Sequence, residues 1–235
     1  GLNYNLLSFP SFKNYPKNHE QSHFINQSLL YKPGTHIPMS IIEKDNGNLF
    51  FGNSGLNPYE YWYSFPGVIE LNLNNYDMTT FDSTDSVIDG RWGIHHEGSY
   101  SHKMFINQIV KDQKGNIWVT NPFCEKYGNM IAIQSKDDGT WSHIQIPDEN
   151  SYRPQTIALD NANRAWVGFA YESLEDTPYS SGGIKVLQYD NLEFSNQTDS
   201  SWVRIKNQGK LPGNDSTASV WSLVFDDMNF LWVLN

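Results

Sequence analysis

A short pattern recurs along this chain: an apolar strand, a tight turn rich in Asp, Asn and Gly, and a second strand that carries a Trp. The pattern occupies residues 40–52, 106–120, 156–168 and 220–234. In the second copy Asp112 precedes the turn and Trp118 follows it, whereas in the first copy Phe50 takes the Trp position. A strand pair that recurs at long intervals is typical of a repeat architecture built from β units.

Further apolar runs around these hairpins predict four-stranded antiparallel units. The expected strands are 39–43, 48–52, 68–73 and 78–81, then 106–111, 116–120, 130–134 and 141–146, then 155–159, 164–169, 183–189 and 202–205. Two more strands, at 218–224 and 230–234, begin a further unit. The fold class is therefore predicted to be all-β: a β-propeller of four-stranded antiparallel blades, seen as about half a propeller with three blades and part of a fourth.

This interpretation divides the chain into five parts. They are an N-terminal segment 1–35 that holds outer strands of a preceding blade, a blade with long loops at 36–103, a blade at 104–154, a blade with an insertion at 155–217, and a truncated blade at 218–235. An unpaired outer strand is prone to aggregation. We therefore expect the rest of the same polypeptide, or a second copy, to close the propeller.

Composition narrows the classes of partner. Aromatic residues make up 14% of the chain and charged residues 18%, which suits strands better than helical bundles. The net charge of −10 would repel a phosphate backbone, so no nucleic-acid partner is expected. Cys124 is the single cysteine. No apolar run reaches the ~20 residues of a membrane helix, so no direct membrane insertion is expected.

Several of these segments also resemble a known family. The segments are 112–119, 160–168, 182–184, 211–214 and 220–232. They are similar to the two-component regulator propeller repeat, which is found in extracellular sensor regions of hybrid histidine kinases of Bacteroidetes and in related surface proteins. The long, aromatic, Asn-rich loops look closest to secreted propellers associated with type IX secretion. The resemblance implies a bacterial protein that is secreted, at the cell surface or periplasmic.

Strand parity indicates which end of the blades carries function. Antiparallel pairing puts the turns within hairpins at one end and the remaining loops at the other. The long loops 53–67, 82–104, 121–129, 170–182 and 206–217 share this second end. Exposed aromatic rings there would stack on sugars or grip peptide. The predicted ligand-binding residues are Tyr61, Trp62, Tyr63, Trp92, His95, His96, Tyr127 and Tyr171.

Other chemistry is given less weight. Trp118, Trp166 and Trp232 recur at one position and are predicted to pack between blades. The Asp-rich turns are predicted to be structural and not calcium sites. The neighbouring His95 and His96 would point to opposite faces of a strand, so no metal site is expected. Catalytic residues and cofactors are not expected either.

The sequence therefore favours a non-enzymatic extracytoplasmic propeller that binds a glycan, a lipopolysaccharide or a protein partner on an aromatic, acidic loop face. Two alternatives stay open. One is an oligosaccharide-sensing periplasmic domain of a hybrid two-component histidine kinase. The other is an enzyme similar to the streptogramin lyases, which are propellers that use a His base with magnesium; His95, His96 or His102 would have to be that base.

Overall fold

The computed structural model describes residues 38–53, 67–81, 88, 91–94, 100–103, 106–122, 130–146, 153–171, 181–189, 202–205 and 218–235. These residues form strands and turns, and none of their segments is a helix long and apolar enough to cross a membrane. The strands are β1 (Pro38–Glu43), β2 (Leu49–Asn53), β3 (Val68–Leu71), β4 (Met78–Phe81), β5 (Arg91–Ile94), β6 (Tyr100–Lys103), β7 (Gln108–Lys111), β8 (Ile117–Thr120), β9 (Ile131–Gln134), β10 (Trp141–Ile144), β11 (Arg153–Leu159), β12 (Arg164–Ala170), β13 (Gly183–Gln188), β14 (Trp202–Ile205), β15 (Ser222–Phe225) and β16 (Leu231–Leu234).

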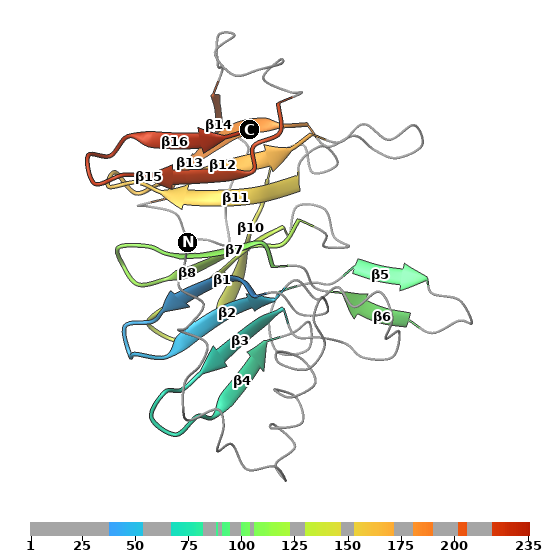
Figure 1. The fold of residues 1–235 in the computed structure, drawn as a ribbon, viewed down its shortest axis with the longest axis vertical. Coiled ribbons are helices and arrows are strands. Elements are labelled where there is room, and N and C mark those ends of the chain that lie inside the picture. The colour runs from blue at the N-terminus through green and yellow to red at the C-terminus, as the bar shows by residue number, and fades with distance from the viewer. Residues whose placement is uncertain are drawn as a thin grey trace.

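The strands form antiparallel sheets that stack on one another (Figure 1). We call β1–β4 blade 1, β7–β10 blade 2, β11–β14 blade 3 and the hairpin β15–β16 blade 4. The first strands of successive blades, β1, β7, β11 and β15, are neighbours in that order. Four-stranded sheets stacked through their first strands are the architecture of a partial β-propeller, as predicted.

Two strand predictions were wrong in informative ways. Strand 218–224 begins only at Ser222, because the Val220 N–H donates to the carbonyl of Phe169 in blade 3, at 3.0 Å. Residues 218–220 therefore follow the neighbouring blade, and pairing with their own blade begins when the Trp221 N–H donates to the Leu234 carbonyl, at 2.8 Å. The connection 82–104, expected to be a loop, contains the separate hairpin β5–β6.

The hairpin turns at the start of the blades share one geometry. Asp112 Oδ1 accepts the N–H groups of Lys114 and Asn116, at 2.9 and 2.8 Å. Asp160 and Asp226 make the same two bonds to the amides two and four residues later. A positive φ follows in each turn, at Gly47, Gly115, Asn163 and Asn229. Gly and Asn tolerate this conformation, so the sequence of these turns is explained by their structural role.

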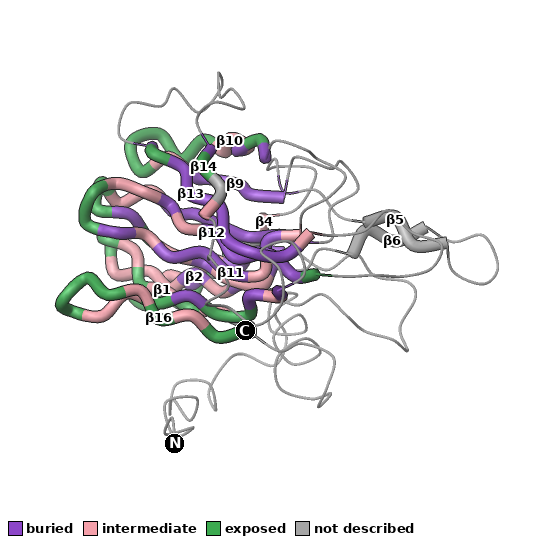
Figure 2. Tube along the Cα trace, turned by 90° about the horizontal axis from the view of Figure 1, so that it is seen from above, coloured by how far each residue is buried: buried purple, intermediate pink, exposed green. Residues whose placement is uncertain are grey.

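An apolar core fills each of the three interfaces between blades. Figure 2 shows the buried segments along the stacked strands. Between blades 1 and 2 it consists of Phe50, Val68, Ile88, Ile106, Ile109, Ile117, Val119 and Ala132. Between blades 2 and 3 it is built around Trp118, Ile131, Ile133, Ile157, Val167, Phe169 and Leu187. Between blades 3 and 4 it consists of Ala158, Ile184, Val186, Val220 and Leu223. Because alternate side chains of a strand point to opposite faces, blades 2 and 3 are buried on both sides.

A hydrogen bond between first strands accompanies each core. A polar side chain four residues before the turn start accepts the N–H of an aliphatic residue in the next blade. These bonds join Ser40 to Ile109, Gln108 to Ile157 and Thr156 to Leu223, at 3.0, 2.8 and 3.0 Å. We call them the inter-blade amide bonds. The N–H groups they satisfy belong to first strands, which have no further strand of their own sheet on that side.

The two ends of the stack differ as strand parity predicted. Figure 1 shows the β1–β2, β3–β4, β7–β8, β11–β12 and β15–β16 turns at one end. The chain leaves β2, β8 and β12 at the opposite end. We call these ends the turn face and the loop face.

A small residue near the end of the second strand lets the next blade approach closely. A Cβ on Gly168 would lie 2.5 Å from Val220 Cγ1 and 2.6 Å from Thr156 Cγ2. A Cβ on Gly52, at the same position of blade 1, would lie 2.7 Å from Ile106 Cγ2. Real carbon atoms do not pack this closely, so a larger residue would push the blades apart.

We expect Gly168→Ala to lower the free energy of unfolding by about 1–3 kcal/mol, because it overpacks the interface between blades 3 and 4. Urea unfolding followed by Trp fluorescence measures this. Gly47→Asn is the control: it lies in open space, and Asn occupies the same turn position in blades 3 and 4. An equal cost for both variants would contradict close packing at Gly168.

Candidate functional site

The predicted ligand-binding residues were assigned to the loop face from the sequence, and most lie outside the described residues. Those are Tyr61, Trp62, Tyr63, His95, His96 and Tyr127. Their role therefore stays a prediction. Tyr171 and the backbone of Trp92 are described.

Tyr171 lies at the start of the loop 170–182, where hydrogen bonds hold its backbone in place. It follows β12, and its side chain is 37% exposed. Its N–H donates to Ser219 Oγ at 2.9 Å, and the Ser219 hydroxyl donates to the Tyr171 carbonyl at 3.4 Å. At the other end of this loop, the Gly183 N–H donates to the Ala218 carbonyl at 2.8 Å. Both ends of the loop 172–180 are thus tied to the chain that enters blade 4.

The hairpin β5–β6 carries a second predicted residue. Trp92 and His102 are directly opposite each other in its register. In the sequence analysis, Trp92 was grouped with the loop aromatics and His102 with the histidines. This pairing places one of the loop aromatics and one of the histidines on the same hairpin, between blades 1 and 2 in chain order.

The turn face carries a repeated carboxylate–indole pair. Trp118 Nε1 donates to Asp112 Oδ2 at 3.1 Å, and the pairs Trp166–Asp160 and Trp232–Asp226 are each 2.9 Å. Trp118 is completely buried and Trp166 packs against the next core, which confirms their predicted packing role. Trp232, on the last strand, is 64% exposed, so for this residue the packing stays a prediction.

Burial works against ionisation of Asp160, but hydrogen bonds from Trp166, Arg164 and Ala162 outweigh it and hold the pKa of this carboxyl below its usual value. The indole bond likewise lowers the pKa of Asp226. These carboxylates are ionised turn anchors whose oxygens are engaged by their own hairpins.

Blade 1 replaces this pair with a different one. The turn-start position holds Lys44, whose N–H donates to the Asn48 carbonyl as Asp112 does to Asn116. Phe50, six residues later, has no side-chain N–H to donate. The Lys44 ammonium lies 4.5 Å from the centre of the Phe50 ring. A cation over an aromatic face thus stands where the other blades have an anion bonded to an indole. The spacing alone could have revealed this exchange.

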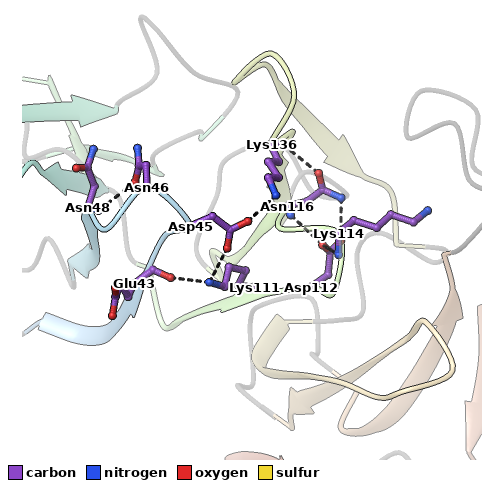
Figure 3. A network of polar contacts seen from close by, with 9 residues as sticks. All are labelled: Glu43, Asp45, Asn46, Asn48, Lys111, Asp112, Lys114, Asn116 and Lys136. Atoms are coloured by element: carbon purple, nitrogen blue, oxygen red, sulfur yellow. Dashed lines mark hydrogen bonds and ion pairs between the residues drawn. The ribbon is translucent and has the colours of Figure 1, made fainter.

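The carboxylate of the first turn, Asp45, serves a different purpose. It bridges blades 1 and 2 by pairing with Lys111 at 3.0 Å and Lys136 at 2.6 Å (Figure 3). The hydrogen bond from Lys136, followed by that from Lys111, lowers the pKa of Asp45 to about 2. This clamp could not be predicted from the sequence, because its lysines belong to strand β7 and to the β9–β10 turn.

A cavity of about 210 Å³ lies beside this clamp. It is lined by Lys44, Asp45, Asn46, Gly115, Ile117, Gln134, Ser135, Lys136 and Gly139. Its charged groups have partners within the protein: Lys44 pairs with Glu70 at 3.1 Å and donates to Gln134 at 3.3 Å, and Lys136 pairs with Asp45. The cavity is therefore best explained as the polar edge of a blade interface. Within the described segments, no three His, Cys, Asp or Glu side chains are grouped as metal ligands.

Comparison with solved structures supports this fold. The extracellular domain of a putative one-component system from B. thetaiotaomicron matches 87% of this chain with a TM-score of 0.52 and 16% identity. The chain folds as part of a β-propeller. It spans 23% of that structure's length. At this identity the likeness concerns the fold.

Two further structures match less closely. PorZ, a surface component of the type IX secretion system of Porphyromonas gingivalis, matches 83% of this chain at a TM-score of 0.48 and 13% identity, and the chain covers 24% of it. Virginiamycin B lyase from Staphylococcus aureus matches 86% at a TM-score of 0.49 and 15% identity, with 50% of the lyase covered. No protein-family model and no curated protein matches the chain.

The Asp45 clamp predicts a pH dependence of stability. Because the folded pKa of about 2 lies below the ordinary value of 3.8, the clamp stabilises the fold fully above about pH 4, and this contribution is lost as the pH falls towards 2. We expect Asp45→Asn to flatten the fall in urea midpoint between these pH values. Asp227→Asn, at the same turn position of blade 4, should behave like the unmodified chain. Equal slopes for all three proteins would contradict the clamp.

Proposed function

We propose that this chain is a non-enzymatic, extracytoplasmic binding propeller that presents its loop face to a partner. The carrying observation is the difference between the two faces. On the turn face, short hairpins use their polar groups internally: Asp112 accepts the indole N–H of Trp118, and Asp45 pairs with Lys111 and Lys136. The long loops leave from the other face. The blades that carry these loops are held together by three apolar cores. Binding residues commonly lie on loops held by such a rigid scaffold.

The cellular location rests on the matched structure. It is described as an extracellular domain, and it shares its fold with most of this chain. The resemblance of the repeats to extracellular sensor and surface propellers supports the same location. The single cysteine is compatible with it, because the fold is held by apolar cores and needs no disulfide.

A glycan is the ligand class that the loop residues suit best. Tyr and Trp rings offer flat apolar surfaces with polar edges, which stack on sugar rings. The loop 54–66 contains Tyr61, Trp62 and Tyr63 in succession, and Tyr171 lies at the base of another loop. The net charge of −10 favours an uncharged oligosaccharide over the phosphates of lipopolysaccharide. A protein partner would use the same aromatic residues.

The test is binding to an oligosaccharide array, followed by calorimetric titration with the best ligand. We expect Trp62→Ala, Trp92→Ala and Tyr171→Ala each to weaken binding about tenfold, which corresponds to the loss of one stacking contact. The melting temperature should change by no more than about 3 °C, because loop substitutions leave the apolar cores intact.

Tyr76→Asn is the matched control. Tyr76 is 39% exposed, close to the 37% of Tyr171, but it lies in the β3–β4 turn on the turn face. Its φ of 62° suits Asn. Equal weakening by this variant would contradict a binding loop face. Magnesium-dependent turnover of a streptogramin that is abolished by His96→Ala would contradict the non-enzymatic proposal.

A further inference from the structure

An extra residue interrupts the first strand of blades 1 and 3 near its loop-face end. The register of β11 with β12 shifts between Pro154 and Thr156, so Gln155 has no partner on β12. The same shift occurs in β1, between Pro38 and Ser40. An unpaired residue of this kind forms a β-bulge, which redirects its own side chain and is over-represented beside functional sites. The bulge positions are therefore candidates for a role beyond folding.

Blades 2 and 4 have an inserted residue at the same position. In each of them two buried residues three positions apart enter one core, and only an inserted residue brings them to the same side. These pairs are Ile106 with Ile109 and Val220 with Leu223. The inserted residue lies five positions before the turn start, as Gln155 does, and it is Asn107 in blade 2 and Trp221 in blade 4. We call Asn107, Gln155 and Trp221 the bulge row.

Two members of the bulge row bond to each other across the interface between blades 2 and 3. Asn107 Nδ2 donates to the backbone carbonyl of Gln155 at 3.2 Å and to Gln155 Oε1 at 2.5 Å. Both side chains are half-buried. A primary amide has two N–H donors and one acceptor oxygen. The contact uses both donors of Asn107, and among the described residues Asn107 Oδ1 and Gln155 Nε2 have no partner. A free acceptor and a free donor thus lie on neighbouring blades.

These groups suit an uncharged ligand that carries hydroxyl groups. A hydroxyl both donates and accepts, so neighbouring hydroxyls of one sugar can donate to Asn107 Oδ1 and accept from Gln155 Nε2. The bulge row contains no ionised side chain, so a charged group would lose its water there without gaining a counter-charge. Trp221, the next member of the row, supplies a flat apolar ring of the kind that stacks on a sugar. Amide donors and acceptors beside an aromatic ring therefore favour a neutral sugar.

We propose that the bulge row is a subsite for an uncharged sugar, with Asn107 and Gln155 bonding to its hydroxyls and Trp221 stacking on its ring. The inference rests on the proposed function and deepens it, because it places a glycan contact on the first strands as well as on the loops. The row belongs to the loop face, since β7, β11 and β15 run from that end towards the turn face (Figure 1). Its members are held by the stacked blades, so binding requires little ordering of the chain.

Exchange of one amide for a carboxylate tests the subsite. Gln155→Glu keeps the Oε1 atom that accepts from Asn107, but it replaces the Nε2 donor with an acceptor. We expect the melting temperature to stay within about 3 °C, and the affinity for the best uncharged oligosaccharide of the array to fall about tenfold. Gln108→Glu is the matched control: its Oε1 accepts the Ile157 N–H inside the interface, so the same exchange beside Asn107 should leave the affinity unchanged. Calorimetric titration measures both.

The same titrations separate failure of the subsite from failure of the proposed function. Weaker binding by Trp62→Ala together with equal affinities of Gln155→Glu and Gln108→Glu would overturn the subsite and leave a binding loop face. Binding of charged oligosaccharides alone would also overturn only the subsite. Absence of binding to every oligosaccharide of the array would overturn both the subsite and the glycan as ligand class. In the unmodified protein, we expect the side-chain amide NMR signals of Asn107 and Gln155 to shift as the uncharged oligosaccharide is added.

Discussion

The fold depends on how the first strand of one blade meets the first strand of the next. A polar side chain accepts an amide N–H across the interface, and the aliphatic residue that owns this amide enters the apolar core beside it. The bond satisfies a backbone group of an edge strand, and the core removes apolar surface from water. Neither sheet face of blade 2 or blade 3 could remain exposed, because both faces carry buried apolar residues. Blades 2 and 3 are consequently stable only between their neighbours.

This constraint separates the two ends of the molecule. On the turn face the polar groups are used internally: indoles and amides bind Asp112, Asp160 and Asp226, and two lysines bind Asp45. On the loop face the loop after β12 starts from a fixed position, because the Tyr171 N–H donates to Ser219 Oγ. A ligand surface can therefore vary on the loops while the stacked blades remain unchanged.

The repeated Asp-to-Trp spacing was sufficient to predict the blades, their order and the direction of their loops. It did not predict the inter-blade amide bonds, because Ser40, Gln108 and Thr156 are chemically different residues that share only a position and the ability to accept a hydrogen bond. The Asp45 clamp was missed for a similar reason, since its lysines lie far away in the sequence. Of the candidate site, the loop face and Tyr171 were predicted as binding elements, and this stays a prediction; the anchoring of Tyr171 by Ser219, 48 residues away, depends on tertiary packing.

Native-state hydrogen exchange followed by NMR tests the central claim most directly. If the blades are stable only as a stack, the amides of Ile109, Ile157 and Leu223 exchange as slowly as the ladder amides inside blades 2 and 3, through global unfolding. Fast exchange of these three amides beside slow exchange within the sheets would show that the interfaces open while each blade stays folded. That result would contradict the account.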